Sequence, residues 1–321
     1  MLVGLGALAM PMPAAAQIQG LRRIAFLSND PSKQSVVFQA FTAGLRDLGW
    51  IEGKNIQIDF HSSAGKDARY PEIAARVVRD DKVDLIATSG SAPTRAAMAV
   101  TDKIPIVFGS TANPVEQGFV KRLAKPGRNV TGLALLVKEL GKKRWQLLKE
   151  VLPQATRFAR LYNAESIEKM QPAIIKDDAE AERMLGVTVE QITVSDEEKI
   201  GPALVKAARS GIEGMHVTAA SLFVVNRALI SKIALEHKLP ILGPDRRYPD
   251  DGILASYGEN FGVHYRRAAF LVDKILRGTT PAEIPVEISK LFEFVINLRT
   301  ARAFGIKVPE AALLQADHVI K

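Results

Sequence analysis

Three short clusters of small polar residues hold most of the chain's capacity for binding chemistry. Each follows a short apolar run, and they are Ser28-Asn29-Asp30, Ser89-Gly90-Ser91-Ala92 and Ser110-Thr111-Ala112-Asn113. Their hydroxyls, side-chain amides and backbone N–H groups can hold a small polar ligand. Any one cluster could equally be the N-cap of a helix, where Ser and Asn are common, so a ligand role depends on all three lying together.

The segments around these clusters alternate between strand and helix patterns. In the first half we predict strands at 22–28, 54–60, 83–88, 104–108 and 129–132, and helices at 36–45, 70–79 and 92–100. A turn is expected at 109–113, and any helix at 115–125 is broken by Pro126-Gly127. Right-handed crossovers between parallel strands bring the strand-to-helix loops to one sheet edge, so the three clusters should converge there.

The second half repeats this plan without repeating its residues. Strands are predicted at 157–162, 187–194, 214–218, 240–243, 254–257 and 292–298, and helices at 138–152, 166–185, 196–209, 221–237, 261–276 and from 308. The candidate edge loops here are Tyr162-Asn163, Thr218-Ala219-Ala220-Ser221, Gly243-Pro244-Asp245-Arg246 and Ser256-Tyr257-Gly258. Two α/β domains of this kind would trap a small molecule between them by hinge closure.

The predicted fold class is therefore α/β, with two parallel-sheet lobes joined by a multi-strand hinge. We assign residues 21–134 and 258–285 to the N-terminal lobe, and residues 135–257 and 286–321 to the C-terminal lobe. The segment 129–134 is the expected first hinge crossing.

Composition narrows the function classes. The chain has 321 residues and a net charge of +8. It has no cysteine, and this excludes disulfides, thiolate metal sites and a cysteine nucleophile. The basic residues are spread along predicted helices and only 6% of residues are aromatic, so we read them as a solvated surface and expect no nucleic-acid partner.

Motifs for catalysis and cofactors are missing from the sequence. There is no Gly-x-Gly-x-x-Gly after a strand, no phosphate-binding Gly-x-x-x-x-Gly-Lys-Ser/Thr loop and no Gly-x-Ser-x-Gly elbow. The histidines lie far apart without metal-ligand spacing. We therefore expect a binding protein with no enzymatic activity, cofactor or metal; on the candidate loops Asp30 and Asp245 are the acidic residues.

The first residues resemble an export signal. Residues 2–12 are apolar, and Ala14-Ala-Ala16 before Gln17 fits a signal-peptidase site. We therefore expect residues 1–16 to be a signal peptide. A signal peptide begins with basic residues and none precedes Leu2, so we expect the true start to lie upstream. The alternative is an apolar tail or a short buried helix.

Several further runs together resemble one known family, the periplasmic ABC-transporter substrate-binding proteins called ABC_sub_bind. These runs are Leu48-Gly-Trp-Ile-Glu-Gly-Lys-Asn55, Ile104-Pro-Ile-Val-Phe108, Asn113-Pro-Val-Glu-Gln-Gly118, Leu123-Ala-Lys-Pro-Gly-Arg-Asn-Val-Thr-Gly132, Ser256-Tyr-Gly258, Phe292-Glu-Phe-Val-Ile-Asn-Leu-Arg-Thr-Ala-Arg-Ala-Phe-Gly305 and Ala316-Asp-His-Val-Ile320. The resemblance covers nearly all of the chain after residue 16.

This resemblance implies two Rossmann-like lobes of the type I periplasmic-binding-protein kind. It also implies a periplasmic monomer that captures a small molecule and delivers it to a membrane permease with a separate ATPase subunit. The rival interpretation is a sensor that presents its ligand to a membrane receptor. A repressor core is disfavoured because no helix-turn-helix precedes Arg22.

One departure from the resemblance concerns the ligand. Family members that bind aromatic amino acids resemble this chain but have an Asp in the loops occupied here by Asn113 and by Ala219-Ala220. A site with hydroxyls, amides and Arg246 but fewer acids suits a neutral or anionic ligand better than a zwitterion. Tyr162 and Tyr257 are expected to pack on the ligand's body.

Overall fold

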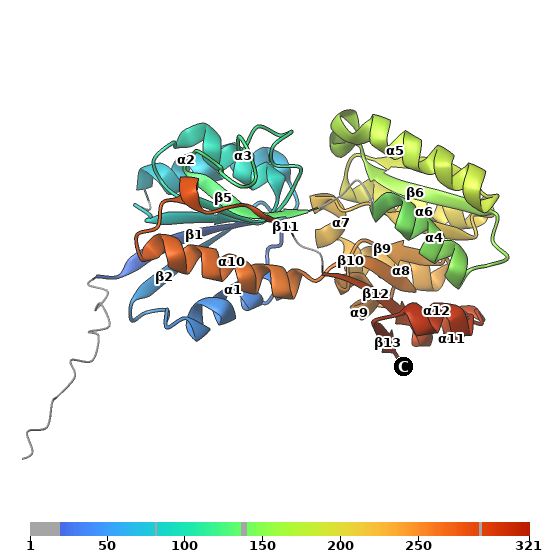
Figure 1. Cartoon of the computed structure of the whole chain (residues 1–321). Coiled ribbons are helices and arrows are strands. Elements are labelled where there is room, and N and C mark those ends of the chain that lie inside the picture. The colour runs from blue at the N-terminus through green and yellow to red at the C-terminus, as the bar shows by residue number, and fades with distance from the viewer. Residues whose placement is uncertain (1–19, 81, 136–139, 289–290) are drawn as a thin grey trace, which may run out of the picture.

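The computed structural model describes residues 20–80, 82–135, 140–288 and 291–321, with only the backbone described for 165–174. The chain forms two sheets, and each is covered by helices on both faces (Figure 1). We call each sheet with its helices a lobe. The prediction of an α/β fold with two mostly parallel sheets is confirmed.

The first sheet has the order β11-β5-β4-β3-β1-β2, and all its pairs are parallel. Its strands are β1 (Arg22–Ser28), β2 (Ile56–Ser62), β3 (Leu85–Thr88), β4 (Ile106–Ala112), β5 (Val130–Leu135) and β11 (Glu287–Ile288). Helices α1 (Val36–Asp47) and α10 (Phe261–Leu276) pack on one face, while η1 (Asp67–Arg69), α2 (Tyr70–Asp80), α3 (Ser91–Val100) and η2 (Pro281–Glu283) complete the lobe.

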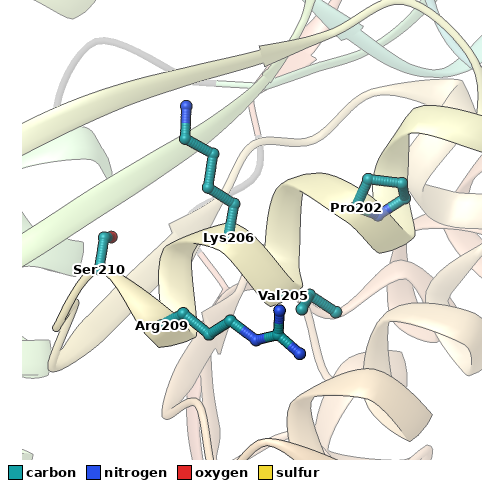
Figure 2. Close-up of a pocket in the computed structure, with 5 residues that line it drawn as sticks. All are labelled: Pro202, Val205, Lys206, Arg209 and Ser210. Carbon is teal, nitrogen blue, oxygen red and sulfur yellow. The ribbon is translucent and has the colours of Figure 1, made fainter.

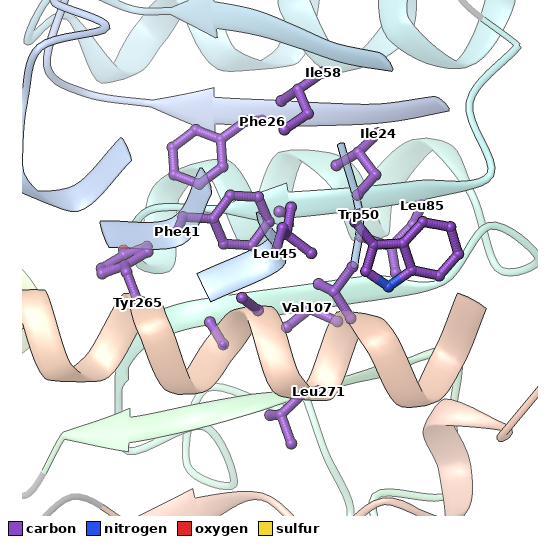
Figure 3. Packing of buried hydrophobic residues seen from close by; sticks show 14 of the residues in the cluster. Ile24, Phe26, Phe41, Leu45, Trp50, Ile58, Leu85, Val107, Tyr265 and Leu271 are labelled. Atoms are coloured by element: carbon purple, nitrogen blue, oxygen red, sulfur yellow. The ribbon is translucent and has the colours of Figure 1, made fainter. Parts of the chain in front are cut away.

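The core of the first lobe lies where α1 and α10 meet the sheet (Figure 3). Phe26 of β1 contacts Phe41 of α1 with ring centroids 5.0 Å apart, and Tyr265 of α10 with centroids 6.1 Å apart. Trp50 is 2% exposed, and its indole N–H donates to Asp273 of α10 over 2.8 Å. Helix α10 is thus fixed to the first sheet, although the strand just before it, Ala255–Glu259, belongs to the second.

The second sheet has the order β13-β12-β10-β9-β8-β6-β7, and it is parallel except at the pair β10–β12. Its strands are β6 (Arg157–Asn163), β7 (Thr188–Val194), β8 (Gly214–Val217), β9 (Ile241–Gly243), β10 (Ala255–Glu259), β12 (Phe292–Asn297) and β13 (His318–Ile320). Its helices are α4 (Leu140–Val151), α5 (Ala164–Leu185), α6 (Glu197–Arg209), α7 (Ser221–Val225), α8 (Arg227–Glu236), α9 (Arg247–Asp250), α11 (Leu298–Phe304) and α12 (Glu310–Gln315).

The chain passes between the lobes three times, from β5 to α4, from β10 to α10 and from β11 to β12. Sheet membership continues to Glu259 in β10 and to Ile288 in β11, slightly beyond the boundaries expected at 257 and 285. The division into lobes at residues 134, 257 and 285 remains our proposal.

Three local predictions were wrong. Strand β4 continues through Ser110 to Ala112, where a turn was expected, because it pairs with β5 again after an irregularity between Phe108 and Thr111. Residues 115–125 contain turns rather than a helix. The helix expected at 221–237 is split at Asn226, whose side-chain amide donates to the carbonyl of Leu222 over 3.0 Å.

The signal peptide expected at residues 1–16 lies outside the described residues. Within the described ranges, no helix combines the length and the apolar character needed to cross a bilayer.

Replacing Trp50 by alanine should destabilise the first lobe. The change removes a buried ring and leaves Asp273 without its indole partner, so we expect a loss of about 3–5 kcal/mol in the free energy of unfolding. Urea unfolding followed by circular dichroism measures it. Leu314→Ala, at a position 81% exposed, is the control and should change the free energy by less than about 0.5 kcal/mol.

Candidate ligand-binding site

The carboxyl edges of the two sheets face one another, and we call the loops there the lobe interface: residues 28–30, 89–92 and 110–113 in the first lobe, and residues 163, 218–221 and 245–247 in the second. Ser28 is fully buried at the end of β1, and its hydroxyl accepts from the backbone N–H of Asp30 over 3.1 Å. The backbone N–H of Ser89 donates to the carbonyl of Leu27 over 2.9 Å. These bonds hold the first two clusters beside each other.

The second cluster begins helix α3. Gly90 has φ 109° and ψ 178°, a backbone conformation that residues other than glycine rarely adopt. It is the N-cap of α3 and makes no side-chain hydrogen bond there. The Ser91 hydroxyl accepts from the side-chain amide of Gln117 over 2.9 Å. The first amides of a helix lack partners within the helix and attract negative charge.

The third cluster lies at the end of β4. Ser110 and Tyr265 hydroxyls are 3.0 Å apart, and the buried hydroxyl of Thr111 has no hydrogen-bond partner among the described residues. Asn113 has φ 43°, in the left-handed region that Asn tolerates better than most residues. Thr111 is 1% exposed, so its hydroxyl is enclosed by protein.

In the second lobe, the loop after β8 faces the first cluster. The Thr218 hydroxyl donates to the carbonyl of Leu161 over 2.9 Å, which fixes the start of this loop. The Ser221 hydroxyl accepts from the side-chain amide of Asn29 across the interface over 3.4 Å. Ala219 is exposed in the same loop, and Asn163 is buried at the end of β6.

A charged contact also spans the interface. Asp30 lies 3.6 Å from the guanidinium of Arg227 at the start of α8, and Arg227 contacts Asp251 at 2.7 Å. Next to this contact, a side chain at Gly65 would meet Val225 of the second lobe within 2.5 Å. The two lobes therefore touch along this side of the interface.

Asp245 is held by Arg247 through a two-pronged ion pair, with both N–O distances 2.8 Å. Burial alone would raise the pKa of Asp245, but the guanidinium outweighs burial and the pKa is lowered. Arg247 also lies over the ring of Phe261 at the start of α10, 4.9 Å from its centroid. Arg246 is exposed and lies 3.7 Å from Asp250.

The two tyrosines expected to pack on a ligand have partners in their own lobe. Tyr162 is 1% exposed and donates its hydroxyl to Asp178 over 2.8 Å. Tyr257 is half-buried, with its ring centroid 5.9 Å from that of Phe292. Their contact with a ligand remains a prediction.

The interface includes several residues that the sequence did not single out. Arg227 and Arg247 lie on helices, where a charge suggests a solvated face, and only the fold shows which carboxylates they reach. Gln117 and Tyr265 act on the loops from distant positions in the chain. For Gln117, the only sequence evidence of a role was its place in the run Asn113-Pro-Val-Glu-Gln-Gly118, which resembles the family.

Among the described residues, one hollow lies at the interface and another lies away from it. A cavity of about 120 Å³ lies at the junction of the lobes, lined by Val36, Asp245, Arg246, Arg247, Asp250, Glu259, Asn260, Phe261 and Gly262. A wider surface hollow of about 670 Å³ lies beside Pro202, Lys206 and Arg209 of α6. Figure 2 shows the side chains that line it. Helix α6 runs back to the amino end of β8, so this second hollow lies away from the lobe interface.

Two α/β lobes with facing polar loops, joined by three crossings, define the class of two-lobed binding proteins. The chain belongs to the ABC transporter substrate binding protein family, whose model matches residues 24–320. Members of this family are extracytoplasmic substrate-binding proteins and not enzymes, so the prediction of no enzymatic activity is confirmed.

Similar proteins cover most of the chain. A tyrosine-binding protein of Clostridioides difficile (strain R20291) is 29% identical over 282 residues, which are 88% of this chain and 78% of that protein. The ABC domain of a Streptococcus pneumonia protein in complex with L-Trp has a TM-score of 0.81 at 22% identity, over 94% of this chain and 99% of that one. The ligand-free, open structure of an adhesive substrate binding protein from Clostridium difficile has a TM-score of 0.65 at 25% identity, with the same shares covered.

Asp245→Asn should lower stability in a pH-dependent way. The folded state lowers the pKa of Asp245, so its ion pair contributes stability above the unfolded pKa of about 3.9, and this contribution is lost as pH falls through the folded value. The melting-temperature gap between wild type and variant should therefore be largest near neutral pH and narrow in acid. Asp250→Asn is the control, since Asp250 is exposed and 3.7 Å from its partner. A gap that stays constant down to strong acid would contradict this assignment.

Proposed function

We propose that this protein is the solute-binding subunit of an ABC importer. It works as a monomer in the periplasm, captures a small organic solute between its lobes and delivers it to the permease with its ATPase subunit. The observation that carries this proposal is the lobe interface, where hydroxyls and amides from both sheets converge and contact each other through Asn29 and Ser221. Family membership and the two-lobed fold support it.

We further propose that the lobes are in the closed arrangement. The contacts of Asp30 with Arg227 and of Gly65 with Val225 require the lobes to be near each other. The TM-scores agree with this interpretation, since the value is 0.81 for the complex with L-Trp and 0.65 for the ligand-free, open structure. Rotating the lobes apart would separate these pairs.

The charges at the interface favour a ligand with a carboxylate and no ammonium group. Asp245 is paired with Arg247, so it offers no free negative charge. Asp30 lies 3.6 Å from Arg227, which also contacts Asp251 at 2.7 Å. Asn113 and Ala219 occupy loops where a carboxylate would be needed to pair with an ammonium. The start of α3 can receive a carboxylate. Because relatives bind tyrosine or L-Trp, we propose an aromatic carboxylic acid as the solute class.

Three matched ligands test this proposal: 3-(4-hydroxyphenyl)propionate, tyrosine and tyramine, which carry the acid alone, both groups and the amine alone. Isothermal titration calorimetry should show the order acid, then tyrosine, then tyramine. Leaving an ammonium without a partner costs roughly 1–3 kcal/mol, so the acid should bind about tenfold or more tightly than tyrosine. Tightest binding of tyrosine would overturn the ligand class but keep the binding function, whereas no binding of a wider metabolite set would count against the function itself.

Asn113→Asp should move the preference toward tyrosine. Asp tolerates the left-handed backbone at φ 43° as Asn does, so the variant adds a negative charge while keeping the loop. We expect the ratio of tyrosine affinity to hydroxyphenylpropionate affinity to rise roughly tenfold. The control is Gln154→Glu, which adds the same charge at an exposed position before β6 and should leave the ratio unchanged. An unchanged ratio in Asn113→Asp would place Asn113 outside the site.

A further inference from the structure

Two neighbouring residues of α10 hold the end of β4, which carries the third polar cluster. The Tyr265 hydroxyl is 3.0 Å from that of Ser110, and Nδ1 of His264 is 3.3 Å from the carbonyl oxygen of Gly109. The ring of Tyr265 lies so close that a β-carbon at Gly109 would be 2.2 Å from its Cε1. Only glycine at position 109 allows this approach.

The segment held by α10 is a β-bulge. The register between β4 and β5 shifts between Phe108 and Thr111, so Gly109 and Ser110 lie in the irregular part of the pairing. A bulge changes the direction of the strand and of the side chains after it. The contacts of His264 and Tyr265 therefore influence where Thr111 and Asn113 point.

His264 also contacts the second lobe. Its Nε2 lies 2.7 Å from Oε2 of Glu259, the last residue of β10 in the second sheet. His264 is 2% exposed and Glu259 is 4% exposed, so water competes little with this contact. The imidazole thus links the bulge of the first sheet to the end of a strand in the second, beside the crossing from β10 to α10.

The two contacts of the His264 ring, with Gly109 and with Glu259, determine how many protons the ring must carry to make both as hydrogen bonds. A carbonyl oxygen can only accept, so Nδ1 must carry a proton to bond to Gly109. With Glu259 ionised, Nε2 must carry one as well, because an unprotonated nitrogen 2.7 Å from a carboxylate oxygen would be repelled. With the ring neutral, Glu259 must hold the proton and donate it. In both cases, which keep the two contacts as hydrogen bonds, the pair holds one proton more than a neutral histidine beside an ionised glutamate. A neutral ring with its proton on Nε2 beside an ionised Glu259 keeps the contact with Glu259 but loses the bond to Gly109.

Neighbouring groups act on Glu259 in opposite directions. Burial raises the pKa of Glu259, opposed by His264 and by Arg144 of α4. Arg144 gives its N–H groups to the carbonyls of Tyr257 and Pro244, at 2.8 and 3.1 Å. The nearby groups on other elements also have partners, Tyr265 with Ser110 and Glu293 of β12 with Asn260 and His318.

We propose that His264 and Glu259 are positioning residues of the ligand site, and that the proton they share links the bulge of β4 to the second lobe. Ligand binding then depends on this proton and weakens as pH rises enough to remove it. The ligand part of this inference rests on the proposed function, but the link itself exists without ligand. Neither residue touches the ligand; both act through Gly109 and the loop after it.

Glu259→Gln is the decisive variant because its amide supplies a permanent N–H to Nε2 of a neutral ring, which keeps the link without the extra proton. In ligand-free protein, the melting temperature of the wild type should fall relative to that of Glu259→Gln by about 4 °C or more between about pH 6 and pH 9. Nitrogen-15 spectra of the histidine rings, assigned with His264→Leu, should show an extra proton on the pair near neutral pH. Parallel melting curves, or a neutral ring beside an ionised Glu259 at neutral pH, would overturn the inference.

The ligand measurement uses 3-(4-hydroxyphenyl)propionate and tyrosine across the same pH range. Wild-type affinity for the tighter ligand should fall roughly tenfold toward high pH, while that of Glu259→Gln stays within about threefold. The double variant Glu259→Gln with His264→Leu removes the link without leaving a buried charge, and it should bind about tenfold more weakly at every pH. Equal pH dependence of wild type and Glu259→Gln would refute the link to binding. If neither ligand binds, the melting and nitrogen-15 results still decide whether the proton is shared.

Discussion

A parallel strand delivers the loop that follows it to only one edge of its sheet, and both halves of the lobe interface depend on this constraint. The clusters after β1, β3 and β4 are about 20 to 80 residues apart in the chain, yet strand pairing brings them to one edge. The loops after β6, β8 and β9 converge in the same way in the second sheet. A surface of small polar residues results without any single motif that would mark it.

The three crossings make these two edges face each other. Helix α10 is important here, because its sequence follows β10 of the second sheet while its apolar face packs with α1 on the first. The N–H of Trp50 bonds to Asp273 near its end, and Tyr265 near its beginning reaches Ser110. The same helix therefore supports the core of one lobe, the bulge in β4 and the contact with Glu259 of the other.

The sequence was sufficient to predict the strands and helices that are marked by a hydrophobic pattern within their own residues. The buried run at Arg22–Ser28 and the helical spacing at Phe261–Leu276 predicted β1 and α10 at the correct positions. The sequence-based prediction was wrong at Ser110, because small residues after a strand suggest a turn. Only the pairing with β5 shows that the strand continues. Asn226 gave a similar error, since the side-chain bond that ends α7 depends on the folded backbone.

The same distinction applies to the candidate site. Loop positions such as Ser28 and Ser221 follow from strand order, and the structure brings Ser221 to Asn29. Arg227, Arg247 and His264 could not be chosen in advance, because a charged residue on a helix is usually solvated and their partners come from elsewhere in the fold. These partners change the electrostatic interpretation: Asp245 is paired with Arg247, and Asp30 shares Arg227 with Asp251.

Capture of a solute between the lobes is the central claim, and the distance between the lobes on ligand addition tests it most directly. The chain has no cysteine, so Lys66→Cys in the first lobe and Lys206→Cys in the second, both at exposed positions, can carry a pair of fluorescent labels. Saturating 3-(4-hydroxyphenyl)propionate or tyrosine should increase energy transfer between the labels, because the closed contacts of Asp30 with Arg227 form as the solute is enclosed. A ligand that binds in calorimetry but leaves the energy transfer unchanged would contradict the account.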